Sequence, residues 1–289
     1  TFTNLSDLNN YISSSNNTKI LFSSKKDIYL TDSIGSFLQS VYSTNGDNIY
    51  SLVSNSIKDT FYFLQTSDDY TNPSIMMFTA NNLTPVIVGT VPVQMDNIHS
   101  FKYYDGEFYY KTSSKLYKIS YNSVSQLLTN VSNVYAFSVH NSSIYYHNWT
   151  GSGGNYNVSY GYSVPYMNNI EYSPYENKLF GYRESNGPCI LKMDASGYSQ
   201  IYTSNNAFQS NGGNHNCPIN FFNDRVYFTA NSSVVSVKTD GSDNKIIAST
   251  TNQHNVNGIV AFKFNFSNTN SGNNSSTTFT NLSDLNNYI

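Results

Sequence analysis

Asparagines in the pattern Asn-x-Ser or Asn-x-Thr are the residues of this chain whose spacing points most directly to chemistry, because that triplet accepts N-linked glycans. A chain rich in Asn, Ser and Thr also produces such triplets by composition, so each site stays open between a glycan acceptor and an ordinary polar turn. Glycans would supply solubility to a chain with few charges, and we therefore predict a secreted glycoprotein. The candidate acceptors are Asn4, Asn16, Asn82, Asn130, Asn141, Asn148, Asn157, Asn231, Asn265, Asn273, Asn274 and Asn281.

Three of these positions carry local features that lower the expected occupancy. Pro85 directly follows the triplet of Asn82, and Asn273 and Asn274 are adjacent, so we do not expect both to be modified.

Cys189 and Cys217 are the two cysteines of the chain. We predict a disulfide between them, with two separate buried thiols as the alternative. Metal binding is not expected, because there is no Cys-x-x-Cys pair and His215 beside Cys217 supplies only two ligands.

Catalytic residues are not indicated by any motif. The five histidines stand in separate contexts, although a Ser-His-Asp set is recognised by geometry and stays open. Residues 239–244, TDGSDN, resemble a calcium loop but lack its later Glu, so a hairpin turn is expected. We therefore predict that the chain is not an enzyme and that it uses no cofactor and no metal.

Charge and hydropathy exclude two classes of partner. The net charge is -3, with 15 Lys and Arg against 18 Asp and Glu, so no basic surface for nucleic acid is expected. No apolar run reaches the roughly 18 residues of a membrane helix, and we predict no membrane insertion.

Composition predicts an all-β fold. Aromatic residues make up 16% of the chain and charged residues 11%, against about 25% charged in an average globular protein. Tyr, Phe, Thr, Val and Ile favour strands, and Asn, Ser and Gly favour turns.

A repeated unit positions the candidate residues. Six segments share an aromatic strand, a short polar turn and a second run of alternating apolar residues, at spacings from 33 to 47 residues. Four short strands per unit of about 40 residues is typical of a β-propeller blade. We predict an all-β, six-bladed β-propeller over residues 19–266, with seven blades as the alternative count and an irregular sandwich as the alternative fold. The anchoring aromatic residues are Tyr29, Tyr62, Tyr109, Tyr145, Phe180 and Tyr227.

Turn dipeptides fall where the hairpins of such blades need them. The predicted turns are Asp105-Gly106, Ser113-Ser114, Asn223-Asp224 and Asp240-Gly241.

The last unit resembles a known repeat. Residues 226–249, VYFTANSSVVSVKTDGSDNKIIAS, are similar to the repeat of six-bladed propellers of the YWTD type and of the related DUF5050 family, and residues 116–129 and 190–203 are weaker copies. The resemblance implies the propeller fold. The first unit, DIYLTD, has Leu30 where the YWTD pattern has Trp, so the resemblance does not extend to the receptor functions of that family.

Ring closure is expected to come from the C-terminal part of the chain. The first unit has three strands, and residues 258–266, GIVAFKFNF, form a strand that no unit follows. We predict that this strand completes the first blade.

The two ends of the chain are identical over twelve residues, TFTNLSDLNNYI, at 1–12 and 278–289. Twelve matched positions do not arise by chance, so the match reflects duplication, design or a longer repetitive chain. We interpret residues 1–18 as a junction segment, 267–277 as a polar linker, and 278–289 as the start of a next repeat.

These observations lead to one preferred function. We predict a structural repeat unit of an extracellular, N-glycosylated fibre or surface polymer, built from tandem or head-to-tail β-propellers. Its partners would be identical neighbouring units and its own N-glycans. The alternative is a secreted propeller that binds a glycan or a protein. An enzyme acting in the central channel would rest on fold alone.

Overall fold

The computed structural model describes most of the strand-forming part of the chain. The described residues are 18–66, 73–80, 82–91, 100–112, 115–120, 123–126, 134–148, 153–155, 158–159, 167–183, 189–194, 197–203, 218–230, 233–249 and 256–263. They form 24 strands, arranged in six four-stranded antiparallel sheets. Among these residues no helix is long and apolar enough to cross a membrane.

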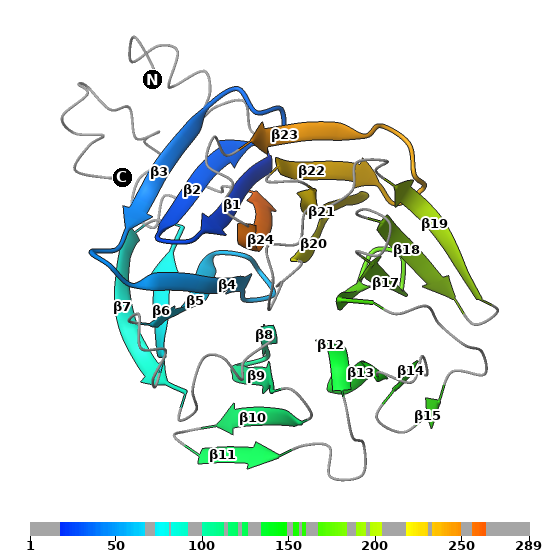
Figure 1. Ribbon diagram of the computed structural model, residues 1–289, viewed down its shortest axis with the longest axis horizontal. Coiled ribbons are helices and arrows are strands. Elements are labelled where there is room, and N and C mark those ends of the chain that lie inside the picture. Colours follow the sequence, from blue (N-terminus) through cyan, green and yellow to red (C-terminus); the bar gives the residue numbers. More distant parts are fainter. Residues whose placement is uncertain are drawn as a thin grey trace, which may run out of the picture.

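Five sheets each use four successive strands, numbered outward from the centre of the molecule (Figure 1). They contain β4 (Asn48–Ser54), β5 (Thr60–Thr66), β6 (Ser74–Thr79) and β7 (Asn82–Thr90); β8 (Ser100–Tyr104), β9 (Glu107–Lys111), β10 (Leu116–Ser120) and β11 (Ser123–Gln126); β12 (Val134–His140), β13 (Ser143–Asn148), β14 (Gly153–Asn155) and β15 (Val158–Ser159); β16 (Asn169–Ser173), β17 (Lys178–Arg183), β18 (Cys189–Asp194) and β19 (Gly197–Thr203); and β20 (Ile219–Phe222), β21 (Arg225–Ala230), β22 (Ser233–Lys238) and β23 (Lys245–Ser249).

The remaining sheet joins the two ends of the described chain. Its order is β24 (Val256–Lys263), β1 (Thr18–Ser24), β2 (Asp27–Asp32) and β3 (Leu38–Ser43). β24 pairs with β1 along its length, for example Val260 opposite Leu21. The prediction that the C-terminal strand completes the first sheet is therefore confirmed.

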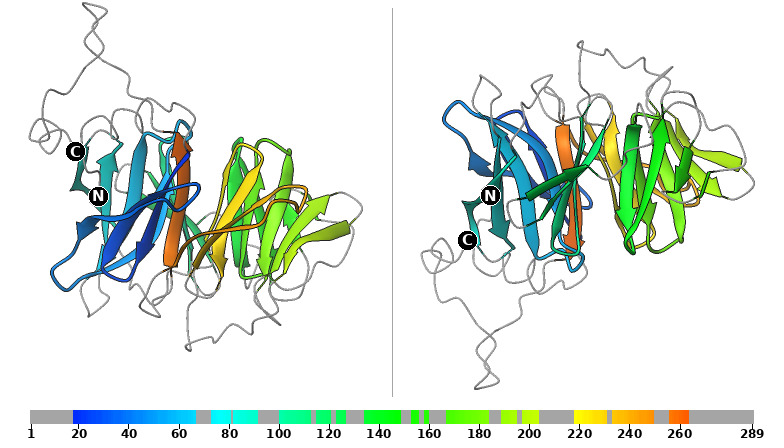
Figure 2. Two further views of the ribbon diagram at one scale, coloured as in Figure 1. Left: turned by 90° about the horizontal axis from the view of Figure 1, so that it is seen from above. Right: turned by 90° about the horizontal axis from the view of Figure 1, so that it is seen from below.

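The first strands of the sheets form a closed ring. Contacts run from β24 to β4, β8, β12, β16 and β20 and return to β24. The sheets stand side by side around this ring, with their strands running through the thickness of the disc (Figures 1 and 2). The predicted all-β propeller fold is confirmed.

The core lies between neighbouring sheets rather than inside any one of them. Phe61 of β5 packs edge-on against Phe262 of the closing strand, with ring centroids 4.9 Å apart. Phe180 of β17 likewise contacts Phe221 of β20 at 4.9 Å. Burying aromatic surface between sheets helps to hold adjacent sheets together, since no ladder of backbone hydrogen bonds joins them.

Gly258 allows the closing strand to approach its neighbour. A Cβ atom at this position would lie 2.1 Å from the backbone nitrogen of Leu52 on β4. Because no side chain fits there, a glycine is required at the seam between the closing strand and β4.

The first sheet differs from the other five in the position of its anchoring aromatic residue. The anchoring aromatic is the third residue of the second strand in five sheets, but Tyr29 lies on β2, which is third from the ring. The closing strand is inserted before β1, so the first repeat is displaced by one strand. Local sequence patterns do not reveal this displacement, because β24 comes from the other end of the chain.

The hairpin turns follow the predicted chemistry. Asp105 and Gly106, with φ of 48° and 84°, connect β8 to β9, and Asn223, with φ of 54°, lies between β20 and β21. Gly241, with φ of 89°, lies in the connection from β22 to β23. Positive φ costs Gly least and Asn or Asp less than most residues, which explains their places here. The predicted Ser113-Ser114 turn lies outside the described residues.

Candidate functional site

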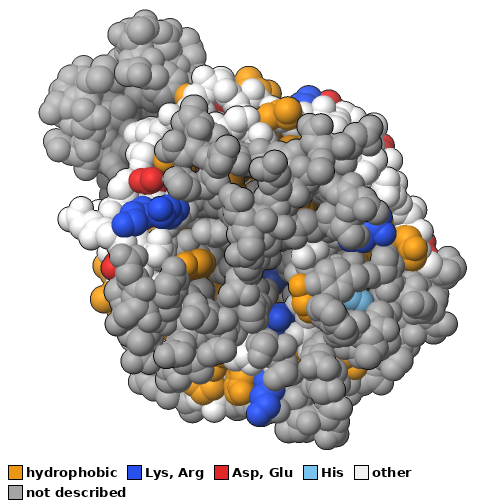
Figure 3. Space-filling model, in the orientation of Figure 1, with side chains coloured by type: hydrophobic (Ala, Val, Ile, Leu, Met, Phe, Trp, Pro, Cys, Tyr) orange, Lys and Arg blue, Asp and Glu red, His pale blue; other side chains and the backbone are white. Residues whose placement is uncertain are grey.

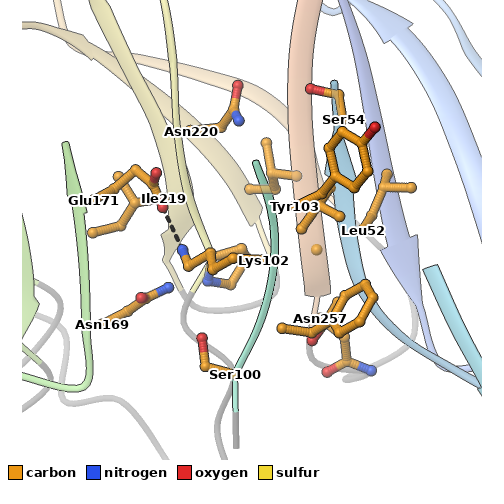
Figure 4. Close-up of a pocket in the computed structure, with 16 residues that line it drawn as sticks. Leu52, Ser54, Ser100, Lys102, Tyr103, Asn169, Glu171, Ile219, Asn220 and Asn257 are labelled. Carbon is orange, nitrogen blue, oxygen red and sulfur yellow. Dashed lines mark hydrogen bonds and ion pairs between the residues drawn. The ribbon is translucent and has the colours of Figure 1, made fainter. Parts of the chain in front are cut away.

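A polar cavity occupies the centre of the ring. It is lined by residues of β4, β8, β16, β20 and β24 and has a volume of about 100 Å³ (Figure 4). That space holds several water molecules but is far smaller than the roughly 300–1,000 Å³ of typical ligand pockets. The cavity therefore suits water or a very small solute.

An ion pair crosses this cavity. Lys102, in the middle of β8, points toward Glu171, in the middle of β16, and its Nζ contacts Glu171 Oε2 (Figure 4). Their side chains are only 12% and 22% exposed. Glu171 Oε1 accepts a hydrogen bond from Ser138 Oγ of β12 at 3.3 Å, and Ser138 Oγ accepts one from the backbone N–H of Tyr172 at 3.0 Å. Three neighbouring sheets are thus connected by charge and hydrogen bonds.

A second lysine reaches the ring from the turn between β4 and β5. Lys58 Nζ donates to Asn220 Oδ1 at 3.0 Å, to the carbonyl of Ala261 at 2.8 Å and to the carbonyl of Phe221. Asn220 Oδ1 also accepts from the backbone N–H of Ala261 at 3.1 Å. Lys58 therefore joins the sheet that begins with β4 to both β20 and the closing strand β24.

Burial of the Lys58 ammonium has an electrostatic cost. Desolvation lowers the pKa of Lys58 to about 7, while the negative charge of Glu171 opposes that shift. An ammonium has three N–H donors, and three acceptors surround this one. The protonated lysine is thus well matched by hydrogen bonds but poorly compensated by charge.

The described channel residues form no recognisable catalytic arrangement. Lys102 and Glu171 are the charged residues among those that line the cavity. Within the described ranges there is no group of three or more metal-ligating side chains. The prediction that the chain is not an enzyme stays a prediction, and the channel is best described as a polar connection between sheets.

Aromatic side chains form a ladder on one face of the disc. This face carries the hairpin turns between the first and second strands of five sheets, and we call it the turn face. Tyr145 stacks on Tyr172 at 5.3 Å, Tyr172 stacks on His140 at 4.1 Å, and His140 meets Tyr104 edge-on at 6.1 Å. We call these four residues the aromatic ladder. They are half-buried and span three neighbouring sheets.

Partial burial also changes the acid–base behaviour of the aromatic ladder. Desolvation lowers the pKa of His140, against the attraction of Glu171, and desolvation raises the pKa of Tyr172. Both shifts favour the neutral form of these two side chains.

Two predicted glycan acceptors are exposed in the structure. Asn82 begins β7, and its Oδ1 accepts from the backbone N–H of Thr84 at 3.0 Å. Asn141 lies in the β12–β13 turn, where its backbone N–H donates to Tyr104 Oη at 2.8 Å. Asn148 is the last residue of β13. The other candidates lie outside the described residues: Asn4, Asn16, Asn130, Asn157, Asn231, Asn265, Asn273, Asn274 and Asn281.

The predicted disulfide is not seen in the structure. Cys189 is a buried free thiol on β18 that donates to Gln200 Oε1 at 3.2 Å. Burial raises the pKa of the Cys189 thiol, with Arg183 opposing the shift. Cys217 lies outside the described residues, as do residues 1–17 of the predicted junction segment at 1–18, the linker at 267–277 and the second dodecapeptide. The last residue of the predicted junction segment, Thr18, begins β1. The disulfide stays a prediction.

Residues 239–244 form a turn with its own hydrogen bonds. Asp240 Oδ1 accepts from the backbone N–H and the hydroxyl of Ser242, at 2.8 and 2.6 Å. Asp243 pairs with Arg225 at 2.7 Å and Lys245 at 3.1 Å. These contacts occupy the carboxylates, in agreement with the predicted hairpin turn.

Sequence reasoning missed the three charged residues of the channel. Lys102 and Glu171 are each the one charged residue at the centre of a short strand, SFKYY and NIEYS. Lys58 lies in a turn that follows a strand, and its sequence context gives no comparable signal of a buried position. A charge in the middle of a predicted first strand is therefore the pattern that would have identified the channel.

No known family model matches the chain, and no curated protein matches it. Among solved structures, a chain in the crystal structure of a nidogen/laminin complex is similar, with 12% identity and a TM-score of 0.59, over 84% of this chain and 98% of that chain. TolB from Acinetobacter baumannii is similar with 12% identity and a TM-score of 0.55, over 84% of this chain and 66% of that chain. At this identity the likeness establishes the fold alone: the chain is a β-propeller.

Proposed function

We propose that the chain is a six-bladed propeller that binds proteins and serves as one repeat unit of an extracellular fibre or surface polymer. Six four-stranded sheets, joined in a ring by their first strands, support the count of six blades. A small central cavity crossed by an ion pair supports binding at the outer surfaces rather than chemistry in the channel.

The observation that carries the repeat-unit proposal is the identical dodecapeptide at 1–12 and 278–289. The ring of described strands closes between Thr18 and Lys263, so neither copy is needed to complete these sheets. We propose that one copy contacts a neighbouring propeller. A head-to-tail contact of this kind does not close on itself and generates a filament.

Removal of one copy tests this proposal. The full chain should form head-to-tail oligomers that negative-stain images show as beads at a regular spacing, and a chain lacking residues 278–289 should not. Equal assembly of the two chains, or single isolated particles in native material, would overturn the fibre proposal while leaving the propeller fold intact.

Extracellular location is the second part of the proposal. The exposed side chains of Asn82 and Asn141 leave room for a glycan at each position. Protein from its natural source should lose mass on treatment with an N-glycosidase, and Asn141→Gln should remove one glycan. An unchanged intact mass would contradict glycosylation and remove the main argument for secretion.

Protein binding through the aromatic ladder is the alternative if no fibre forms. Aromatic residues are enriched in protein interfaces, and half-buried stacked rings supply contact area at small entropic cost. The similarity in fold to a chain of a nidogen/laminin complex makes extracellular proteins the first partners to test. Tyr172→Ala should reduce capture of a partner about tenfold or more. Tyr198→Ala, on the exposed outer strand β19, is the matched control.

A further inference from the structure

The outer strand β7 is an exposed apolar edge. It is nine residues long and is the last strand of its sheet. Three consecutive aliphatic side chains, Val86, Ile87 and Val88, are 49%, 66% and 45% exposed, and no residue of β7 is charged. Proteins usually protect such an edge with charges, because its unpaired backbone groups are able to bind another strand.

The sequence of this edge is nearly symmetric. Residues 84–90 read Thr-Pro-Val-Ile-Val-Gly-Thr, so Ile87 is flanked on both sides by Val, and Thr occupies both ends. An antiparallel pair of two such strands, centred on Ile87, would place each side chain beside one of its own kind. Only the positions of Pro85 and Gly89 break the symmetry.

We propose that β7 binds β7 of a second copy of this chain, antiparallel, about a two-fold axis at Ile87. Ile87 then lies opposite Ile87 of the second copy, Val86 opposite Val88, and Thr84 opposite Thr90. Pairs of β-branched residues on neighbouring strands stabilise a sheet, and a two-fold contact uses the same patch on both copies.

Pro85 and Gly89, the two residues that break the symmetry of the sequence, are compatible with this pairing. Pro85 would lie opposite Gly89 of the second copy, so its ring meets a residue without a side chain. Proline lacks an N–H group and is accepted on edge strands. Against β6, Gly89 pairs with Ile75 and Ile87 pairs with Met76, so Val88 is the extra residue of a β-bulge, and between the two register shifts only Val86 and Ile87 lie in uninterrupted register.

The extent of the edge determines the strength of the contact. A short strand edge with three exposed side chains buries much less surface than a stable protein–protein interface, which buries about 1,600 Å² in total. The contact between separate copies is therefore weak. The absence of charge removes repulsion between identical strands, which is what self-pairing needs. This pairing is lateral and does not rest on the proposed head-to-tail fibre.

Another exposed strand provides a matched control. β23 (Lys245–Ser249) is also the outer strand of its sheet, and its Ile246 is 70% exposed. It differs from β7 in being shorter, in carrying Lys245 and in lacking the symmetric sequence. Ile87 and Ile246 therefore differ in their surroundings but not in side-chain type or exposure.

Cysteine cross-linking tests the register of the proposed pair. The full chain is produced in a host without N-glycosylation, so that Asn82 carries no glycan beside the edge. Across an antiparallel pair the Cα atoms lie about 4.5–5.5 Å apart, within the range of a disulfide. Ile87→Cys should form a covalent dimer under mild oxidation at least tenfold faster than Ile246→Cys. Thr84→Cys should form one only when mixed with Thr90→Cys.

Sedimentation gives an independent measurement. The unsubstituted chain should associate as its concentration rises toward roughly 1 mM, and Ile87→Lys should lose that association whereas Ile246→Lys should keep it. Any head-to-tail assembly through the dodecapeptides should persist in Ile87→Lys. Equal cross-linking of Ile87→Cys and Ile246→Cys would overturn the proposal, as would equal association of the two Lys variants. Neither result would contradict the fibre.

Discussion

The inner ring and the outer rim of this propeller are built from the same kind of strand but have opposite properties. At the ring, Lys58, Lys102 and Glu171 are held by specific partners, and Gly258 lies where no side chain fits. At the rim, Ile87 and Ile246 are largely exposed. The comparison indicates that the ring carries the stability of the fold, whereas the rim is available for interactions with other molecules. In the space-filling view, Lys and Arg side chains are visible both in the middle of the face and near its edge, and hydrophobic groups are visible near the edge (Figure 3).

The largest difference between ring and rim should come from a single methyl group at the closing seam. Gly258→Ala places a Cβ atom 2.1 Å from the backbone of Leu52, and backbone cannot move as a flexible side chain would. We expect a loss of about 3 kcal/mol or more in the free energy of unfolding. Gly197→Ala is the control, because a Cβ atom there meets nothing within 4 Å. Urea denaturation of both variants measures the effect, and similar midpoints would contradict a tight seam.

Removal of the Lys58 ammonium should have the next largest effect. Lys58→Met leaves three acceptors in the ring without their donor, and an unsatisfied buried polar group costs about 1–3 kcal/mol. Relief of the buried charge offsets part of that cost, so we expect a net loss of about 2 kcal/mol. Lys245→Met, at a side chain 46% exposed, should change stability by less than about 0.5 kcal/mol. If both variants unfold at the same urea concentration, Lys58 does not hold the ring together.

The pH dependence of stability gives a second test of the role of Lys58 in the ring. The folded-state pKa of Lys58 is lowered from 10.5 to about 7, so between these values the unfolded chain binds a proton that the folded chain does not. Stability of the unsubstituted chain should therefore rise with pH relative to Lys58→Met, by up to about 1.4 kcal/mol per pH unit above pH 7. Below pH 7 both states are protonated and the difference should be constant. Parallel curves for the two proteins from pH 6 to 9 would contradict the lowered pKa.

The smallest effect is expected at the rim. Ile246→Ser removes an exposed side chain on β23 and should change the free energy of unfolding by less than about 0.5 kcal/mol. Thermal unfolding of this variant beside Gly258→Ala measures the contrast directly. A loss similar to that of the ring variant would show that the rim also contributes to the stability of the fold.

Much of the fold could be predicted because its signals are local. The aromatic strands, the turn dipeptides and the regular spacing indicated an all-β propeller, and the unmatched C-terminal strand indicated how the first sheet is completed. The turn at Asp105 and Gly106 has the positive φ values that these residue types suggested. Such signals survive in sequence because strand alternation and turn geometry depend on neighbouring residues.

The candidate site was predictable only in part. Asn82 and Asn141 are recognisable from a three-residue pattern, and the structure adds that their side chains are exposed. The ion pair of Lys102 and Glu171 joins residues 69 positions apart, and the Lys58 contact to Ala261 spans 203 positions. No local pattern encodes those separations, so the channel could not be assembled from the sequence.

The sequence by itself determined the strand composition, the repeated unit, the turn types and the symmetry of the β7 segment, since each depends on residues close together in the chain. The tertiary structure decided which strand stands third in the first sheet, where Tyr29 therefore lies, and which lone charges meet at the axis. It also decided that Val86, Ile87 and Val88 face outward. These outcomes follow from ring closure, which places the last described strand beside the first and determines which edges remain exposed.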